Sequence, residues 1–265
     1  MKIKLFKKKF NKISGDNNQI IAICGDKKEF LQLEYETKLN ITGNNNTVIF
    51  DYNLVGKINR TFPKGLSIRI RGNNNYIKIE FPIKFSGGSH IGEHGDNNYF
   101  EIGTTLETVN DAEFYPEEGS SIIIGRNCQF YSGRLRVIAN NNYKNNSKIV
   151  IGNGVYIAVD NIIRTSNGHT LIDAKTGKAL PSNEPQDVII EDNVWICSRC
   201  VTLKGSYISE GSIVGACSLV NKKFNEPNVL IAGNPAKIIK HDITWDKRHY
   251  NIFMKEEELN EIKQN

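Results

Sequence analysis

His169 lies in a polar stretch of the chain, RTSNGHTLID, and is the residue best suited to move a proton. A neutral imidazole can accept a proton from a hydroxyl group near pH 7, which makes His169 a candidate general base. Most histidines on loops are simply solvated, so the residue type alone does not assign this role. What supports it is the place of His169 in the repeat pattern of the chain.

The cysteines and the other closely spaced histidines indicate structural residues. Cys197 and Cys200 form a CxxC pair, a spacing found in redox and zinc sites. No second CxxC or CxxH accompanies them, and both fall inside the repeat described below, so we interpret both as structural. His90 and His94 have the spacing of ligands on a helix face, but glycines interrupt a strand-like sequence there. We therefore predict no metal site, and no disulfides, because five cysteines occur without an export signal.

A strict period of six residues runs through Val188–Lys222. The register positions hold β-branched residues, and mostly small residues follow four positions later. Neither a helix nor a flat strand has this period. A solenoid with three short strands per coil does, because every sixth residue then points into the interior. The register residues are Ile190, Ile196, Thr202, Ile208, Val214 and Val220, and the small ones are Val194, Cys200, Ser206, Ser212 and Ser218.

The periodicity divides the chain into three parts. Residues 1–120 carry a looser repeat of glycine, Asp/Asn residues and alternating apolar residues, which predicts irregular coils of the same solenoid with stacked asparagines along one corner. A separate small β-domain is the alternative. Residues 121–240 hold the regular hexads, and 241–265 form a tail with a short helix expected at Phe253–Lys263. The predicted fold class is all-β, a parallel β-solenoid with an extruded loop and a short C-terminal helix.

The hexads are interrupted at Arg164–Asp187, a segment rich in glycine, proline and polar residues. We expect a hairpin turn within it, at Lys175–Gly177. A loop this long that leaves a regular solenoid is usually functional or disordered. His169 lies six residues after Ile163, where the chain leaves the coil, and this position favours a functional loop.

Charge and hydropathy limit the partners. The net charge of +5 suits an anionic ligand but is too small to indicate nucleic acid. No run of about 18 apolar residues occurs, so we expect no transmembrane segment. The basic start, MKIKLFKKKFNKI, lacks the apolar stretch of a signal peptide, which predicts a cytoplasmic protein. A peripheral location at the inner face of the membrane is the alternative, since a basic segment suits an anionic surface.

Four features occur together: the hexads, a loop bearing His169, Trp195 at the end of a hexad, and the motif AGNPAK at 232–237. In this combination the chain resembles the hexapeptide-repeat acyltransferases, which are left-handed parallel β-helices that form trimers and use acetyl-CoA. The segment 162–196 resembles the bacterial capsule and sialic-acid O-acetyltransferases more than the serine or maltose enzymes. The resemblance covers about residues 121–240.

By this resemblance His169 is the general base, and Trp195 lies beside the thioester, where its N–H would steady negative charge. Packing of Trp195 against a neighbouring subunit is the alternative. Asn167 stands where related sequences often place a carboxylate before the histidine. An acid that orients His169 is then either absent or supplied by Asp160 or Asp173, and the sequence leaves this choice open.

The resemblance also implies residues that bind acetyl-CoA. Ser198 and Ala216 fall where small side chains border the pantetheine arm. Lys222, Lys223 and Lys237 fall where basic residues lie near the CoA phosphates. Surface lysines are common, so a plain solvated role stays open for each lysine.

The implied function is direct transfer of an acetyl group from acetyl-CoA to a hydroxyl of a bacterial surface glycan, either a capsule or a sialic-acid-containing polysaccharide. The implied assembly is a homotrimer with active sites between subunits and no metal. The positive net charge favours an anionic acceptor. The alternatives are an N-acetyltransferase acting on an amino or nucleotide sugar and a non-enzymatic solenoid that binds glycan.

Overall fold

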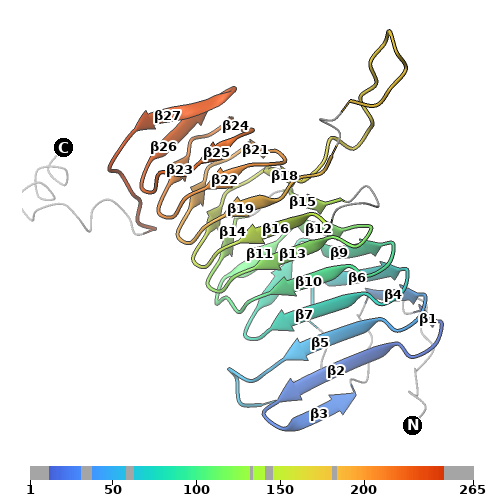
Figure 1. The fold of residues 1–265 in the computed structure, drawn as a ribbon. Coiled ribbons are helices and arrows are strands. Elements are labelled where there is room, and N and C mark those ends of the chain that lie inside the picture. Colours follow the sequence, from blue (N-terminus) through green and yellow to red (C-terminus); the bar gives the residue numbers. More distant parts are fainter. Residues whose placement is uncertain are drawn as a thin grey trace, which may run out of the picture.

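The computed structural model describes residues 12–30, 38–57, 63–131, 134–140, 146–180 and 184–247. Within these ranges every regular element is a β-strand, and the strands stack into an elongated solenoid from which a long loop stands out (Figure 1). No described segment forms a helix long and apolar enough to cross a bilayer. The helix expected at Phe253–Lys263 lies outside the described residues.

Parallel strands of successive coils form three long sheets, A, B and D, and a small sheet C. Sheet A consists of β1 (Lys12–Ser14), β4 (Lys38–Thr42), β6 (Leu66–Arg71), β9 (Ser89–His94), β12 (Ala112–Pro116), β15 (Leu135–Ala139), β18 (Ile162–Arg164), β21 (Val201–Thr202) and β24 (Leu219–Val220). Sheet B consists of β2 (Gln19–Cys24), β3 (Lys27–Phe30), β5 (Thr47–Asp51), β7 (Tyr76–Glu80), β10 (Tyr99–Ile102), β13 (Ser121–Ile124), β16 (Lys148–Ile151), β19 (Val188–Ile190), β22 (Tyr207–Ile208) and β25 (Lys223–Phe224). Sheet D consists of β14 (Gln129–Phe130), β17 (Tyr156–Ile157), β20 (Trp195–Ile196), β23 (Ile213–Val214), β26 (Leu230–Gly233) and β27 (Ala236–Lys240), and sheet C of β8 (Lys84–Ser86) and β11 (Thr108–Asn110).

From β13 onward the chain visits sheets B, D and A in a fixed order, so these sheets form the three sides of a prism. Sheets A and B also run without a break through the Asn-rich coils, which therefore share two continuous sheets with the hexad coils. Sheet D begins only at β14. The last strand, β27, pairs antiparallel with β26 and covers that end of the sheet.

The interior of the solenoid follows the predicted period of six. The six register residues from Ile190 to Val220 are at most 1% exposed, and so are the five small residues that follow them. Two cysteines take the small position and donate their thiols to carbonyl oxygens of the next coil. Cys128 Sγ lies 3.0 Å from the Gly152 oxygen, and Cys200 Sγ lies 3.2 Å from the Gly215 oxygen. The structural role predicted for Cys200 is confirmed.

Stacked asparagines join successive N-terminal coils, as the sequence predicted. Asn75 and Asn98 are each 1% exposed. The side-chain oxygen of Asn75 accepts a hydrogen bond from the backbone N–H of Asn98 at 2.9 Å, and its amide donates to the Gly95 carbonyl at 3.0 Å. An outer ladder runs beside the buried one, where the Asn45 amide donates to Asn74 at 3.1 Å and both residues have left-handed backbone with φ of 57°.

Each of these asparagine turns follows a glycine because neighbouring coils approach closely there. Gly43 has a φ of 121°, and a Cβ on it would lie 2.0 Å from the Gly72 carbonyl oxygen. The loose repeat of glycine and asparagine in the sequence thus marks the tight turns that stack between successive coils.

Replacing Asn75 with alanine is expected to destabilise the fold by about 2 kcal/mol, because the buried Asn98 N–H would lose its partner and the Gly95 carbonyl would keep only its 3.2 Å hydrogen bond from the Asn98 amide. Asn40→Thr, on the outward side of β4, is the matched control and should cost less than about 0.5 kcal/mol. Urea denaturation measures both. Equal shifts of the two midpoints would show that the buried ladder adds no stability.

Candidate active site

The predicted extruded loop is an arm between β18 and β19, at the edge where sheet A passes to sheet B (Figure 1). Its outer part is a hairpin, in which Ile172 pairs antiparallel with Ala179. The N–H of Gly177 donates to the Asp173 carbonyl at 2.9 Å and closes the turn. The hairpin predicted at Lys175–Gly177 is therefore confirmed.

His169 lies on this arm with its side chain exposed. Asp173 is engaged in the hairpin turn, where its Oδ1 accepts hydrogen bonds from the N–H groups of Thr176 at 2.7 Å and Lys175 at 3.0 Å. These bonds lower the pKa of Asp173 because they stabilise its ionised form. Asp160 lies between β17 and β18, on a different edge of the prism. Asp173 is thus engaged in the hairpin turn, and Asp160 of the same chain lies away from the arm.

Trp195 is the first residue of β20 and points outward from sheet D. Its ring contacts Tyr156 of the preceding coil, with centroids 6.3 Å apart, and Trp245, with centroids 5.8 Å apart. The Nε1 atom of Trp195 is buried and has no hydrogen-bond partner among the described residues. An unpaired buried donor of this kind costs the folded protein free energy.

His169 and Trp195 do not meet within one chain. The arm leaves the prism at the edge between sheets A and B, whereas Trp195 faces outward from sheet D, which is the side opposite that edge. Although Trp195 follows soon after the arm in the sequence, it does not lie close to His169 within one chain. A site that uses both residues requires a second copy of the chain.

The residues predicted to bind acetyl-CoA lie at two edges of the prism and in sheet D. Ser198 and Ala216 lie in successive turns between sheets D and A, which are joined by a backbone hydrogen bond of 3.0 Å. Lys237 lies on β27, in sheet D. Lys222 and Lys223 lie at the edge between sheets A and B, which also carries the arm.

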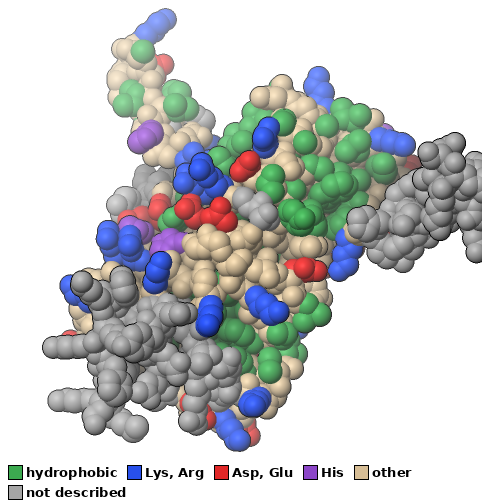
Figure 2. Space-filling view, turned by 180° about the vertical axis from the view of Figure 1, so that it is seen from behind, with side chains coloured by type: hydrophobic (Ala, Val, Ile, Leu, Met, Phe, Trp, Pro, Cys, Tyr) green, Lys and Arg blue, Asp and Glu red, His purple; other side chains and the backbone are tan. Residues whose placement is uncertain are grey.

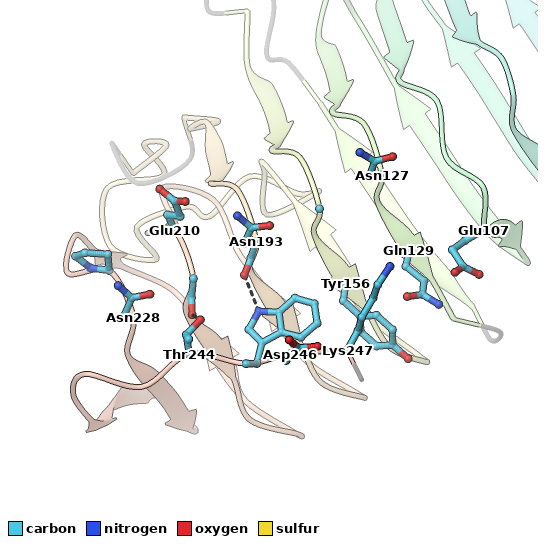
Figure 3. Close-up of a pocket in the computed structure, with 14 residues that line it drawn as sticks. Glu107, Asn127, Gln129, Tyr156, Asn193, Glu210, Asn228, Thr244, Asp246 and Lys247 are labelled. Carbon is cyan, nitrogen blue, oxygen red and sulfur yellow. Dashed lines mark hydrogen bonds between the residues drawn. The ribbon is translucent and has the colours of Figure 1, made fainter. Parts of the chain in front are cut away.

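Sequence reasoning missed the aromatic neighbours of Trp195. Tyr156 occupies the corresponding position one coil earlier and pairs with Trp195 in register, so the hexad pattern held the signal for it. Trp245 lies beyond the hexads and carries no periodic signal. Its ring centroid lies 5.9 Å from that of Tyr156, and its Nε1 donates to the Asn193 carbonyl at 2.6 Å, as drawn in Figure 3.

The CxxC cysteines and the closely spaced histidines show no sign of a redox or metal site. Burial raises the pKa of the Cys197 thiol to about 11 and also raises that of Cys200, so both thiols stay protonated near neutrality. His90 and His94 lie on β9, and Nδ1 of His90 is 2.7 Å from the Ser67 hydroxyl. Burial lowers the pKa of His90. Within the described ranges, no three His, Cys, Asp or Glu side chains gather as metal ligands would.

Proteins similar to this chain are acetyltransferases. The polysialic acid O-acetyltransferase of Escherichia coli is 33% identical over 129 residues, which are 48% of this chain and only 39% of that protein's length. The candidate lipopolysaccharide biosynthesis O-acetyl transferase WbbJ, also of Escherichia coli, is 31% identical over 46% of this chain and 67% of that protein. The crystal structure of the polySia specific acetyltransferase NeuO matches with a TM-score of 0.62 and 25% identity, over 95% of this chain and 96% of that one. No known protein-family profile matches.

The chain belongs to the hexapeptide-repeat acetyltransferases, as the sequence resemblance predicted. The fold is accordingly a left-handed parallel β-helix. The match with NeuO extends over the Asn-rich coils and so is wider than the resemblance at residues 121–240.

Proposed function

We propose that this protein transfers an acetyl group from acetyl-CoA to a hydroxyl of a bacterial surface glycan, of the capsule or sialic-acid-containing class. The observation that carries the proposal is the position of His169, exposed on an arm that leaves a solenoid shared with NeuO over 95% of the chain. The names of two relatives, a polysialic acid O-acetyltransferase and a lipopolysaccharide O-acetyl transferase, support a hydroxyl of a glycan as the acceptor.

In the proposed reaction the acceptor oxygen attacks the thioester carbonyl carbon while the imidazole of His169 takes the hydroxyl proton. The carbonyl oxygen becomes an oxyanion, and the buried, unpaired Nε1–H of Trp195 donates to it. The carbon–sulfur bond then breaks, and the proton passes from His169 to the leaving thiolate. The products are the acetyl ester and free CoA, with no acyl group on the protein.

The proposed assembly is a homotrimer whose active sites lie between subunits. The arm of one chain would supply His169, and the face of sheet D in the next chain would supply Trp195. This arrangement accounts for the opposite placement of the two residues in one chain. It also gives a partner surface to three apolar arm residues, Leu171, Ile172 and Leu180, which are 49%, 59% and 37% exposed. Figure 2 shows apolar side chains on the arm, which stands clear of the body.

Acetyl-CoA would bind along the edge between sheets D and A. The small side chains of Ser198 and Ala216 leave room there for the thin pantetheine arm. We assign Lys237 of the same chain to the CoA phosphates, together with Lys222 and Lys223, which would come from the arm-bearing edge of the adjoining subunit. All five cysteines are free, which supports a reducing compartment such as the cytoplasm, where the protein would act in solution or at the inner face of the membrane.

Release of free thiol from acetyl-CoA tests the function. The protein should release thiol with acceptors that offer only hydroxyl groups, such as capsular oligosaccharides, and the product should carry a base-labile acetyl ester. Faster release with amino or nucleotide sugars and a base-stable amide product would favour N-acetylation. Absence of release with every acceptor, together with glycan binding, would leave a non-enzymatic solenoid.

Trp195→Phe is expected to lower kcat about 10-fold or more with little change in the KM for acetyl-CoA, because the ring stays and the N–H is lost. Trp195→Ala should also raise this KM, since the aromatic contacts with Tyr156 and Trp245 disappear. Steady-state kinetics over a range of acetyl-CoA concentrations separates the two effects. If Trp195→Phe has the wild-type kcat, Trp195 serves packing alone.

A further inference from the structure

A groove lies at the edge where sheet B passes to sheet D (Figure 3), and two residues that line it, Tyr156 and Trp245, contact the ring of Trp195. One wall is formed by turns of successive coils, and the other by residues 244–247. These belong to the segment 241–247, which we call the strap. The groove encloses about 660 Å³, enough for one or two sugar rings. The side chains that line it are mostly polar, with two aromatic rings among them, Tyr156 and Trp245.

The strap is fixed to the coils by hydrogen bonds from three consecutive residues. The N–H of Ile243 donates to the Asn228 carbonyl at 2.8 Å, and the Thr244 hydroxyl donates to the Gly211 carbonyl at 3.0 Å. The indole of Trp245 donates to the Asn193 carbonyl at 2.6 Å. Because each bond reaches a different turn of the solenoid, the wall is held in place along the length of the groove.

The groove continues to the proposed thioester site. A second cavity, of about 570 Å³, shares Tyr156 and Trp245 with the groove and adds Tyr131 and Trp195 to its lining. An acceptor lying in the groove would thus have its reactive end directed toward the indole of Trp195. The acceptor would then approach from the B–D edge, opposite the D–A edge that carries Ser198 and Ala216.

The lining has the chemistry of a sugar site. A pyranose ring presents a face of C–H groups, which suits the flat indole of Trp245, and a rim of hydroxyls, which suits side-chain amides. Asn127, Gln129 and Asn228 supply such amides along the groove. Backbone N–H groups are mostly taken up by the coils, so recognition in the groove falls to these side chains.

The charge of the groove opposes an anionic sugar. Glu107 and Glu210 face it from the coils, and Asp246 also lines it, against one basic residue, Lys247. The net charge of +5 does not offset this, because the first eleven residues hold five lysines and no acid. Residues 12–247 contain 26 basic and 25 acidic residues, so the part of the chain that forms the groove carries almost no excess positive charge.

We propose that this groove binds the acceptor glycan through an uncharged pyranose unit stacked on Trp245. This inference rests on the proposed function for its direction toward Trp195, and it concerns the class of acceptor. An anionic unit such as a sialic acid would meet Glu107 and Glu210 and be disfavoured there by repulsion between like charges. Anionic units of a mixed glycan would lie outside the groove.

Binding without acetyl-CoA tests the inference. Wild-type protein is titrated with a neutral oligosaccharide series and with chain-length-matched oligosialic acid, by calorimetry and saturation-transfer NMR. Neutral oligosaccharides are expected to bind at least 10-fold more tightly than oligosialic acid. Trp245→Ala should weaken neutral binding at least 10-fold, whereas Trp245→Phe should keep it within about 3-fold. The double variant Glu107→Gln, Glu210→Gln leaves the strap intact and should improve oligosialic acid binding about 10-fold.

Asp26→Asn, in the exposed turn between β2 and β3 at the far end of the solenoid, is the charge control and should change neither affinity. Tighter binding of oligosialic acid than of every neutral series, with no effect of the double variant, would overturn the inference. So would neutral binding that Trp245→Ala leaves unchanged.

Thiol release separates this inference from the proposed function. Neutral binding that depends on Trp245, without thiol release from acetyl-CoA, would support the groove and reject the acetyl transfer. Thiol release whose acceptor KM is the same in wild type, Trp245→Ala and the double variant would support the transfer and reject the groove.

Discussion

Replacing His169 with alanine is expected to lower kcat for acetyl transfer about 100- to 10,000-fold, the contribution of a positioned general base. The side chain is exposed on the arm, so its removal should leave the solenoid intact. Thiol release with a hydroxyl acceptor measures the rate, and circular dichroism and light scattering check fold and assembly. His94→Ala, on the outer side of β9, is the matched histidine control and should keep the wild-type rate. A folded His169→Ala protein that retains most of its rate would refute the assignment.

Mixing two inactive variants tests whether the site is shared between chains. His169→Ala and Trp195→Ala subunits, co-expressed with different tags and purified through both, should regain part of the wild-type rate. Recovery is expected because a mixed trimer contains at least one interface with an intact His169 from one chain and an intact Trp195 from the next. Mixed assemblies as inactive as their parents would mean that one chain supplies both groups.

The second large effect concerns Glu93, which lies in the core of the solenoid. Its side chain points inward from β9, opposite Ile70 of β6, and the residue is 0% exposed. Neither carboxyl oxygen has a hydrogen-bond partner among the described residues. Burial away from water disfavours the charged form and raises the pKa of Glu93 well above 4.5.

Glu93→Met is expected to stabilise the protein by about 1–3 kcal/mol at pH 8, the cost of an unsatisfied buried polar group. The sign of the pH dependence follows from the raised pKa of the folded state. The free energy of unfolding of the wild type is then highest below the pKa of Glu93 in the unfolded chain, near 4.5. It falls as the pH rises through the pKa of Glu93 in the folded protein. The gain from methionine should therefore be small at pH 4.5 and grow with rising pH.

Thermal unfolding between pH 4.5 and pH 8 measures this difference, since each kcal/mol corresponds to about 2–4 °C in Tm for a domain of this size. Glu113→Met is the control, because Glu113 lies on the outer side of sheet A and pairs with Arg136 at 2.7 Å. It should bring no stabilisation that grows with pH. A Glu93→Met protein whose Tm gain is constant with pH would show that the pKa of Glu93 is not raised in the folded protein.

The regular half of the fold could be predicted because its interior allows few residue types at each sixth position. The buried series from Ile190 to Val220 is sufficient to predict the solenoid. The repeat of glycine and asparagine likewise predicts the stacked turns at Gly43 and Asn75. Glu93 could not be predicted as a core residue. A glutamate is normally expected on the surface, and only the pairing of Glu93 with Ile70 in the strand register shows that its side chain faces the interior.

The candidate site was only partly visible in the sequence. His169 and Trp195 were found through the resemblance, but spacing along the chain did not reveal that they face opposite sides of one chain. The distribution of the lysines could have been predicted, because the chain returns to the same edge of the prism every three hexads. Ala216 therefore lies on the same edge as Ser198, and Lys222, one hexad after Ala216, lies on the next edge. The strap could not be predicted from the sequence, because the hydrogen bond from Trp245 to Asn193 joins segments that are far apart along the chain.

The arm interrupts the chain without interrupting the sheets. On one side of it β18 pairs with β15 and β21, and on the other β19 pairs with β16 and β22, so the stacking of coils is the same as elsewhere in the solenoid. Doubling the length of such an insertion costs only about 0.6 kcal/mol of closure entropy. Evolution can therefore exchange one arm for another of different length while the scaffold stays folded, and new acceptor preferences can arise without a new fold.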